Sequence, residues 1–186
     1  MKIIKRILIL TALLIVAAIL FRGAIYRTVV GYRATGERTL YMATNKQLIQ
    51  YIDENDKENS NIEDIVKLSL WITSQKLTFS TEKTERDPNK LIHTKKANCI
   101  GYSLFYSAVC NYLLEKHSLS DWQARPQIGQ IYAFGVNLHS WLQHPFLQDH
   151  DFVLIKNKKT HEKIAVDPSV YDYLRINFVT LKENRK

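Results

Sequence analysis

One stretch of the sequence, residues 98–115, restricts the possible folds more than any other. Apolar and aromatic side chains occupy nearly every face of a helix built over it. The only polar stripe consists of three residues spaced by four: Ser103, Ser107 and Asn111. A helix that is apolar on almost all sides is enclosed by other elements. Asn98 is a favourable N-cap residue and places Cys99 at the first helical position, so we expect a central buried helix that begins with a cysteine.

Helical patterns precede this central helix. Residues 45–55 are predicted to form a short amphipathic helix, and residues 61 to about 75 a longer one. Ser60 followed three residues later by Glu63 indicates a capping box, in which two side chains satisfy backbone amides at the start of the longer helix. The polar residues 80–96 are expected to form a loop ahead of the cysteine.

Strand patterns follow the central helix. The extended candidates are residues 127–136, 152–155 and 163–166, and the connection 137–150 is rich in histidine and aromatic residues. Helices first and an antiparallel sheet after them indicate an α+β fold, with the cysteine helix packed on the sheet. We assign this domain to residues 41–180.

An apolar run near the N-terminus extends from Ile7 to Phe21 and is interrupted only by Thr11. A membrane helix needs about 20 apolar residues, with ~17 as the lower end of the range. We expect residues 1–22 to form one transmembrane helix that acts as an uncleaved signal anchor; a cleaved signal peptide and a buried helix are the alternatives. Residues 23–40 are then a juxtamembrane stalk. Because basic residues lie on both sides of the run, the orientation is open, and we favour an extracytoplasmic domain on the cell membrane.

The formal charge of +8 is concentrated near this run. Residues 1–40 contain seven Lys and Arg against one acidic residue, which leaves 19 basic and 17 acidic residues for the rest of the chain. A domain with so small a net charge does not have the electrostatic signature of a nucleic-acid-binding protein. The basic residues therefore favour a membrane surface as the partner, and we expect no nucleic acid.

The chain has two cysteines, Cys99 and Cys110, which excludes a disulfide framework. On one helix they are separated by about 16 Å along the axis, whereas a disulfide requires Cα atoms within ~7 Å. A cysteine is a nucleophile only as the thiolate, and both the positive end of a helix dipole and a nearby imidazolium favour that form. Cys99 has the first of these features, and Cys110 is expected to be an inert core residue.

A histidine partner for Cys99 has to come from elsewhere in the chain, which has six histidines. If residues 157–160 form the turn between the last two predicted strands, His150 lies directly opposite Asp167. Such residues share a face of the sheet with Cβ atoms about 5 Å apart, so the carboxylate can hold the imidazole while its other nitrogen faces the thiol. A slip of one residue would place the two on opposite faces.

Three segments follow one another along the chain: NCIGYSLFYSAVCNYLL, HDFVLI and KIAVDPSVY. Together, over residues 61–170, they resemble the papain-like core of the transglutaminase-like superfamily, in particular its small bacterial, membrane-anchored members. That family places a nucleophilic cysteine at the start of a buried helix, a histidine at the opening of one strand and an aspartate in a DP pair that ends the next. The resemblance implies that Cys99 is the nucleophile, His150 the base and Asp167 the acid that orients it.

The resemblance further implies a cysteine enzyme that acts on an amide or peptide bond of a protein or peptide substrate. We favour hydrolysis, as in a protease or amidase, over cross-linking, because no acceptor site is identified. The sequence departs from the family pattern where Ala97, Asp151 and Phe152 replace a glycine, a small residue and a tryptophan. These departures motivate the alternative of a catalytically silent, membrane-anchored transglutaminase-like module that binds a partner.

We expect no cofactor. His139 and His144 lie five residues apart in the predicted connection and are the pair that could suggest a metal site. No thiolate pair lies near them in the sequence, so the pattern of a structural zinc site is incomplete.

Overall fold

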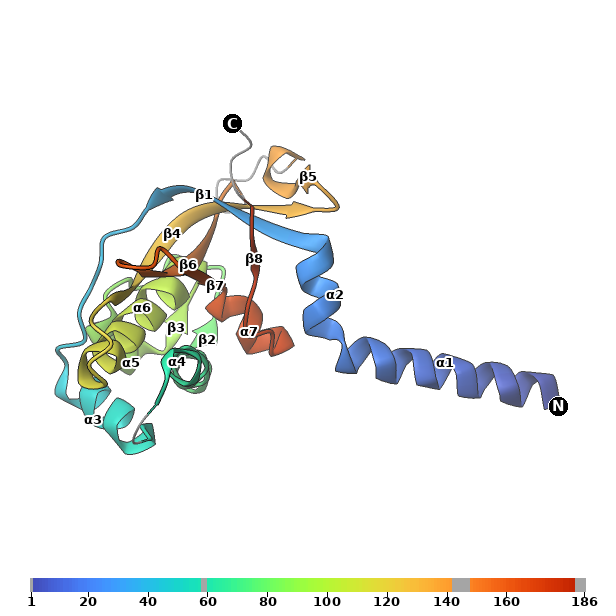
Figure 1. The fold of residues 1–186 in the computed structure, drawn as a ribbon, viewed down its shortest axis with the longest axis horizontal. Coiled ribbons are helices and arrows are strands. Elements are labelled where there is room, and N and C mark those ends of the chain that lie inside the picture. Colours follow the sequence, from blue (N-terminus) through green and yellow to red (C-terminus); the bar gives the residue numbers. More distant parts are fainter. Residues whose placement is uncertain (1, 58–59, 142–147, 183–186) are drawn as a thin grey trace.

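The computed structural model describes residues 2–57, 60–141 and 148–182 of the 186-residue chain. Its helices are α1 (Lys2–Leu20), α2 (Arg22–Val29), α3 (Lys46–Asn55), α4 (Ile62–Lys76), α5 (Pro88–Thr94), α6 (Cys99–Lys116) and α7 (Pro168–Leu174), with one 3-10 turn at Leu138–Trp141. Its strands are β1 (Val30–Glu37), β2 (Thr78–Phe79), β3 (Lys96–Ala97), β4 (Trp122–Ala133), β5 (Val136–Asn137), β6 (His150–Asn157), β7 (Lys163–Val166) and β8 (Thr180–Leu181). Figure 1 shows a body of helices and sheet from which α1 projects alone. The α+β class predicted from the sequence is confirmed.

The main sheet has the strand order β7-β6-β4-β1-β8, with β5 paired to β4. Its pairs are antiparallel except for β1 and β8, which run parallel. The amide of Val179, just before β8, donates to the carbonyl of Ala165 in β7 (2.9 Å), so the two ends of the strand order approach one another. The sheet therefore curves around a small core of four buried residues: Tyr32, Phe152, Ala165 and Val179.

Helix α6 packs against the other face of the sheet and forms the centre of the larger core. Along β6, Phe152 belongs to the small core and Val153 to the large one, as the alternation of side chains along a strand requires. The side chain of Asn111 in α6 donates to the carbonyl of Ala124 and accepts from its amide, both at 2.9 Å. Strand β1 pairs with β4 only from Gln127 onward, so among the described residues Ala124 has no neighbouring strand on that side. The side-chain amide of Asn111 makes the hydrogen bonds that such a strand would make. The predicted central buried helix is confirmed.

The segment 23–40, expected to be a juxtamembrane stalk, is part of the domain. Its residues form most of α2 and the whole of β1, which lies between β4 and β8 in the sheet. The alternating residues Val30, Tyr32 and Ala34 all contribute to the small core. This alternation is a strand signal that the intervening basic and glycine residues concealed. The folded domain thus includes α2 and does not begin at residue 41.

The start of α4 differs by one residue from the prediction. The helix begins at Ile62, and its capping box is formed by Asn61 and Asp64 instead of Ser60 and Glu63. Asparagine is as good an N-cap as serine, and an acidic side chain three residues later closes the box in either position, so the two alternatives are nearly equivalent in sequence.

The segment 80–96, expected to be a polar loop, contains a helix. Asp87 caps α5 by accepting from the amide of Asn89 (2.9 Å), and Pro88 occupies the first turn, where no intrahelical donor is needed. Strands β2 and β3 flank this segment and pair in parallel, which brings its two ends together directly before Cys99.

The predicted strand 127–136 differs at both ends. Strand β4 extends back to Trp122 through Pro126, whose missing N–H is tolerated because β1 does not pair with β4 at that point. At the other end the chain turns at Phe134 and Gly135 into β5, and both residues have positive φ (48° and 87°). Two residues with positive φ are what a tight hairpin turn requires.

The hairpin of β6 and β7 does not have the predicted register. The side chain of Asn157 accepts from two amides of the turn while its backbone stays paired, so the turn comprises residues 158–161 and not 157–160. Each residue of β6 therefore faces a partner two positions further along β7 than predicted. His150 and Asp167 are accordingly not directly opposed. A shift of two residues nevertheless keeps every side chain on its predicted face, whereas a shift of one would have reversed it.

Helix α1 is long and apolar enough to cross a membrane. Residues Ile3–Leu20 have a mean hydropathy of 2.6, and none of this segment is buried in the structure. The alternative of a buried N-terminal helix is therefore wrong. A membrane span and a signal sequence both fit a helix of this length and composition.

The contact between α6 and β4 predicts a specific loss of stability. Replacing Asn111 by alanine leaves the buried amide and carbonyl of Ala124 without their partner, and we expect the free energy of unfolding to fall by about 2–4 kcal/mol. The matched control is Ser107→Ala, one turn earlier on the same helix, because the buried Ser107 hydroxyl has no hydrogen-bond partner in the described structure. That variant should stay within ~0.5 kcal/mol of the wild type in urea unfolding. Equal losses in the two variants would contradict the assignment.

Candidate active site

Cys99 is the first residue of α6. Asn98 caps the helix, its side-chain oxygen accepting from the amide of Gly101 (3.2 Å). A Cβ on Gly101 would lie 2.8 Å from the Cβ of Ala97, so a glycine is needed for the helix to begin this close to β3. Cys99 is therefore held at the positive end of an 18-residue helix, and 7% of the residue is exposed.

His150 opens β6 and lies between an acid and the thiol. Its Nε2 is 2.6 Å from Oδ2 of Asp167. The Cys99 side chain is among the groups that raise the pKa of the same imidazole. Because Nε2 is engaged by the carboxylate, Nδ1 is the nitrogen that is free to face the thiol. The structure thus brings together all three residues that the sequence singled out.

Asp167 is completely buried and is the N-cap of α7. Its Oδ1 accepts from the amides of Ser169 (3.0 Å) and Val170 (3.1 Å) and from the Ser169 hydroxyl (2.7 Å). Its Oδ2 accepts from His150 and from the hydroxyl of Tyr32 (2.8 Å). Five donors thus converge on one carboxylate, which stabilises its charged form and fixes its orientation.

Tyr32 extends this set of hydrogen bonds to a second tyrosine. The hydroxyls of Tyr26 and Tyr32 are 2.6 Å apart. Since Tyr32 gives its single proton to the carboxylate, Tyr26 is the donor within the pair. Burial, with the nearby charge of Asp167, raises the pKa of both phenols, that of Tyr26 to about 12, so both stay protonated at ordinary pH. The hydrogen bonds therefore all point in one direction, from Tyr26 on α2 to Tyr32 on β1 and from Tyr32 to Oδ2 of Asp167. The same oxygen accepts from His150.

His150 and Asp167 each stabilise the charged form of the other. Burial alone would lower the pKa of His150, but the charge of Asp167 and its hydrogen bond outweigh burial and raise the pKa well above its usual value. Burial would likewise raise the pKa of Asp167, and the His150 charge together with the hydrogen bonds it receives lowers it instead. The two groups are therefore an imidazolium and a carboxylate over a wide pH range.

A second buried carboxylate, that of Asp151, lies beside Cys99, His150 and Asp167, the three residues called the triad from here on. Nε and Nη2 of Arg38 donate to its two oxygens, both at 2.9 Å. The hydroxyl of Ser103, one turn after Cys99 on α6, is 3.5 Å from Oδ2 of the same carboxylate. The hydrogen bond to Asp151 is the main cause that raises the pKa of Arg38. Asp151 thus joins Arg38, the residue that follows β1, to the first turns of α6.

Cys110 differs from Cys99 in its position on the helix and in its complete burial. It is completely buried in the middle of α6, and burial raises the pKa of its thiol to about 12. Both thiols are free, as the helical spacing predicted. Among the described residues no group of three His, Cys, Asp or Glu side chains is arranged to hold a metal ion, and His144 lies outside those residues.

A cleft of about 720 Å³ lies elsewhere, between α4 and α7. The residues that line it are Asn55, Lys57, Ser60, Asp64, Lys67, Leu68, Trp71, Tyr171 and Asn177. None of the three triad residues is among them. The candidate site is thus defined by its hydrogen bonds and charges and not by this cleft.

No family model, curated protein or solved structure matches the chain. The class of protein to which it belongs has to be inferred from the site and the fold themselves.

Sequence reasoning missed the residues that support the triad from β1. Tyr32 and Arg38 lie in the segment expected to be a stalk, so neither enters the site inferred from the sequence. The apolar alternation around Tyr32 is a signal that could have located it. Nothing in the sequence marks Arg38 as the partner of Asp151, because the two are 113 residues apart.

The raised pKa of His150 and the lowered pKa of Asp167 predict how stability depends on pH. The contribution of Asp167 is present above its unfolded pKa, ~3.9, and is lost as the pH falls through the lower folded value. That of His150 is present below about 6.5 and is lost as the pH rises through the higher folded value. The difference in unfolding free energy between wild type and Asp167→Asn should therefore be largest between about pH 4 and 6.5, at roughly 3 kcal/mol. Urea unfolding across pH measures it, and a difference independent of pH would contradict the ion pair.

The tyrosine chain predicts graded changes at His150. Without the hydrogen bond from Tyr32, the Asp167 oxygen becomes a stronger acceptor for the imidazolium, so Tyr32→Phe should raise the pKa of His150 further. Tyr26→Phe should raise it less, because Tyr26 acts only by polarising the Tyr32 hydroxyl. NMR titration of the His150 ring nitrogens reports both shifts. In a Tyr32→Phe background, adding Tyr26→Phe should not change the pKa of His150 any further. If Tyr26→Phe shifts that pKa as much as it does in the wild type, the two tyrosines do not act in series.

Proposed function

We propose that this protein is a membrane-anchored, transglutaminase-like cysteine hydrolase that cleaves an amide or peptide bond. The single observation that carries the proposal is the position of His150, whose Nε2 lies 2.6 Å from Oδ2 of Asp167 and whose pKa the Cys99 side chain helps to raise. A buried helix that starts with the nucleophile, and a histidine and an aspartate held on neighbouring strands, support the same class of enzyme. Cys99, His150 and Asp167 are the proposed catalytic residues.

The proposed reaction begins with the thiol proton already on His150, because the raised pKa of the imidazole favours its protonated form and leaves Cys99 as the thiolate of an ion pair. The Cys99 thiolate attacks the carbonyl carbon and forms the S–C bond, and the carbonyl oxygen becomes an oxyanion. The first-turn amides of α6 have no intrahelical acceptor, so the amide of Cys99 itself is a suitable donor to that oxyanion. When the C–N bond breaks, His150 returns its proton to the departing amine. Water then attacks the thioester with His150 as the base and releases the acid.

Asp167 has a positioning role in this reaction. It accepts from Nε2 and stabilises the positive charge that the imidazole carries after taking the thiol proton. Its other oxygen is held by Ser169 and Val170 at the start of α7, so the carboxylate cannot rotate without losing those bonds. The imidazole is therefore held with Nδ1 toward the thiol before any substrate arrives.

The cellular setting is part of the proposal. Helix α1 would remain as a signal anchor that spans the cell membrane once, with the domain outside the cytoplasm. The substrate would be a protein or peptide reached at that membrane surface. Hydrolysis is preferred over cross-linking because water needs no acceptor site of its own.

A covalent probe tests the proposal. A peptide-like amide mimic with a thiol-reactive group, incubated with the detergent-solubilised full chain, should label Cys99 and leave Cys110 unmodified. Cys99→Ala should abolish labelling and Cys110→Ala should preserve it. His150→Ala should slow labelling at neutral pH by about 10²–10⁴-fold, the usual contribution of a general base.

The controls also separate the enzyme from a silent binding module. A small iodoacetamide reagent measures whether Cys99 is accessible at all, independent of any recognition of the probe. If iodoacetamide reaches Cys99 at the same rate in wild type and in His150→Ala, the histidine does not activate the thiol. That outcome, or undiminished probe labelling of Cys99→Ala, would reject the proposed function.

A further inference from the structure

The side of the body from which α1 leaves has an unusual hairpin tip. The turn between β4 and β5 has Phe134 at its first position, with a φ of 48°, where asparagine, aspartate or glycine is preferred. An aromatic residue in this left-handed conformation is disfavoured, and 83% of Phe134 is exposed, so the folded domain gains little from it. Val136, two residues on, is 50% exposed. The tip thus presents two apolar side chains to its surroundings.

The hairpin tip is fixed to the helix that follows the apolar span. The amide of Phe134 donates to the carbonyl of Val29 at the end of α2 (2.9 Å). Helix α2 follows α1 after the single residue Phe21, with no linker between them. Eight residues of helix extend roughly 12 Å, so the tip lies within that distance, plus the length of a side chain, of the end of the span.

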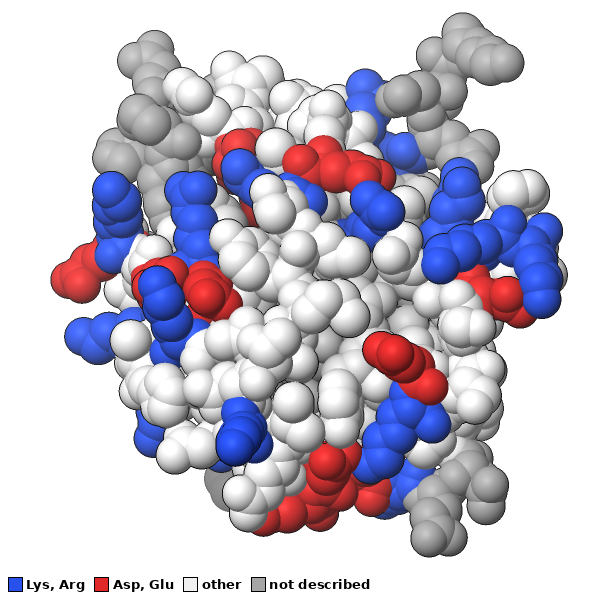
Figure 2. Space-filling view, turned by 90° about the vertical axis from the view of Figure 1, so that its left-hand side faces the viewer, with Lys and Arg blue, Asp and Glu red and all other residues white. Residues whose placement is uncertain are grey.

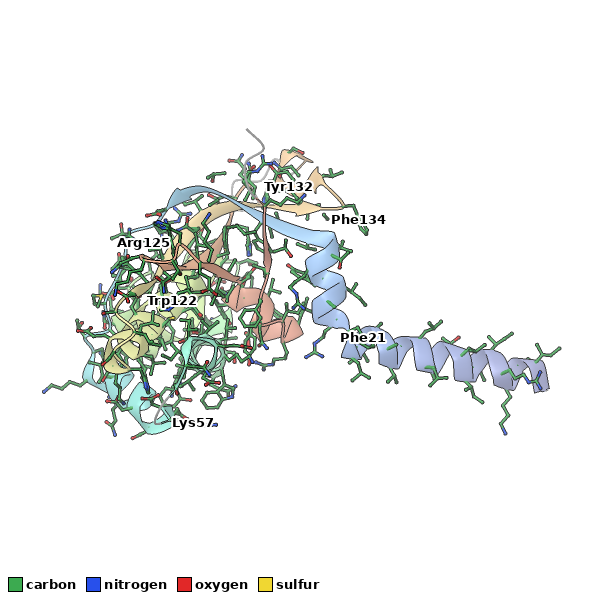
Figure 3. The ribbon with its side chains drawn as sticks, viewed as in Figure 1. Phe21, Lys57, Trp122, Arg125, Tyr132 and Phe134 are labelled. Atoms are coloured by element: carbon green, nitrogen blue, oxygen red, sulfur yellow. The ribbon has the colours of Figure 1, made fainter. Side chains whose placement is uncertain are left out.

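Figures 1 and 3 show how these parts are arranged. In Figure 1, α2 runs across the direction of α1, and the β4–β5 hairpin reaches past α2 toward the side on which α1 projects. Figure 3 places Phe134 on that side, while Arg125 lies on the opposite side of the body. Figure 2 shows that opposite side, where basic and acidic side chains surround an uncharged centre.

Helix α2 lies between the span and the tip and carries exposed side chains of its own. Ile25 is 49% exposed, and Arg22 and Arg27 are exposed near it. Arg22 also donates from Nε to the carbonyl of Leu174 (2.7 Å), which fastens the start of α2 to α7. Apolar side chains at interfacial depth, with arginines beside them, are the combination that binds the boundary between headgroups and acyl chains.

We propose that the exposed side chains of α2 and of the β4–β5 turn, named here the membrane-side face (Ile25, Phe134 and Val136), rest in the lipid headgroup layer of the bilayer that α1 crosses. The occupant is lipid and not a second protein, because α1 without a linker holds this face against the membrane at all times. The inference rests on α1 as a membrane span, a part of the proposed function. It adds a second point of attachment, which stops the domain from rotating about α1 and sets the height of the active site above the membrane.

Site-specific labelling of the full chain in vesicles tests this inference. Single cysteines are introduced in a Cys99→Ala, Cys110→Ala background, labelled with an NBD fluorophore and reconstituted in vesicles of phosphatidylcholine and phosphatidylglycerol that contain a shallow doxyl-labelled lipid. The test variant is Phe134→Cys. Its matched control is Arg125→Cys, on strand β4, which leads to the turn, but on the side of the body away from α1. Leu10→Cys, within α1, reports on the span itself.

The expected result is a blue-shifted emission at position 134 and quenching by the doxyl lipid several-fold stronger than at position 125. If the fluorophore at position 10 is quenched but the one at position 134 emits as in water, like that at position 125, the proposed membrane-side face is wrong. In that case α1 still spans the membrane. Aqueous emission at both 10 and 134 would overturn the anchor and this inference together. Neither result bears on labelling of Cys99, which tests the enzyme separately.

Discussion

The buried carboxylate of Asp167 is the group on which the rest of the structure depends. Placing an ion in a protein interior is unfavourable by several kcal/mol unless other groups replace its hydration. Here five donors from β6, β1 and the first turn of α7 do so. Each of these elements is thereby held in one position relative to the end of β7. His150 is one of the five, so its orientation toward Cys99 follows from the same requirement that fixes the fold.

Helix α2 connects the apolar helix α1 to this carboxylate. Tyr26 on α2 donates to Tyr32, which donates to Asp167, and Thr180 fastens the carbonyl of Arg27 to β8 (2.7 Å). The segment between the apolar span and the sheet is therefore a structural part of the proposed active site and not a tether. Displacing α2 would remove the first donor of the chain, so a movement of α2 can affect His150 through the two tyrosine hydroxyl groups.

Local patterns in the sequence were sufficient for the centre of the site. The apolar faces around Cys99 predicted a buried helix, and Asn98 predicted where it begins, because capping and periodicity act within a few residues. The pairing of His150 with Asp167 survived an incorrect register, since a two-residue shift preserves the face of each side chain. The support from β1 could not be obtained in this way. Its strand pairs with residues about 100 positions away, and its single apolar face is interrupted by glycine and arginine.

The central claim, that Cys99 acts as a nucleophile assisted by His150, is tested most directly by trapping the acyl-enzyme. The full chain is mixed with an activated ester or amide of a short peptide, quenched in acid and digested, and each cysteine peptide is weighed by mass spectrometry. The account predicts an acyl thioester on Cys99 that forms rapidly in the wild type, forms slowly in His150→Ala and disappears on neutral incubation with water. An unmodified Cys99 in a protein whose thiol still reacts with iodoacetamide would contradict it.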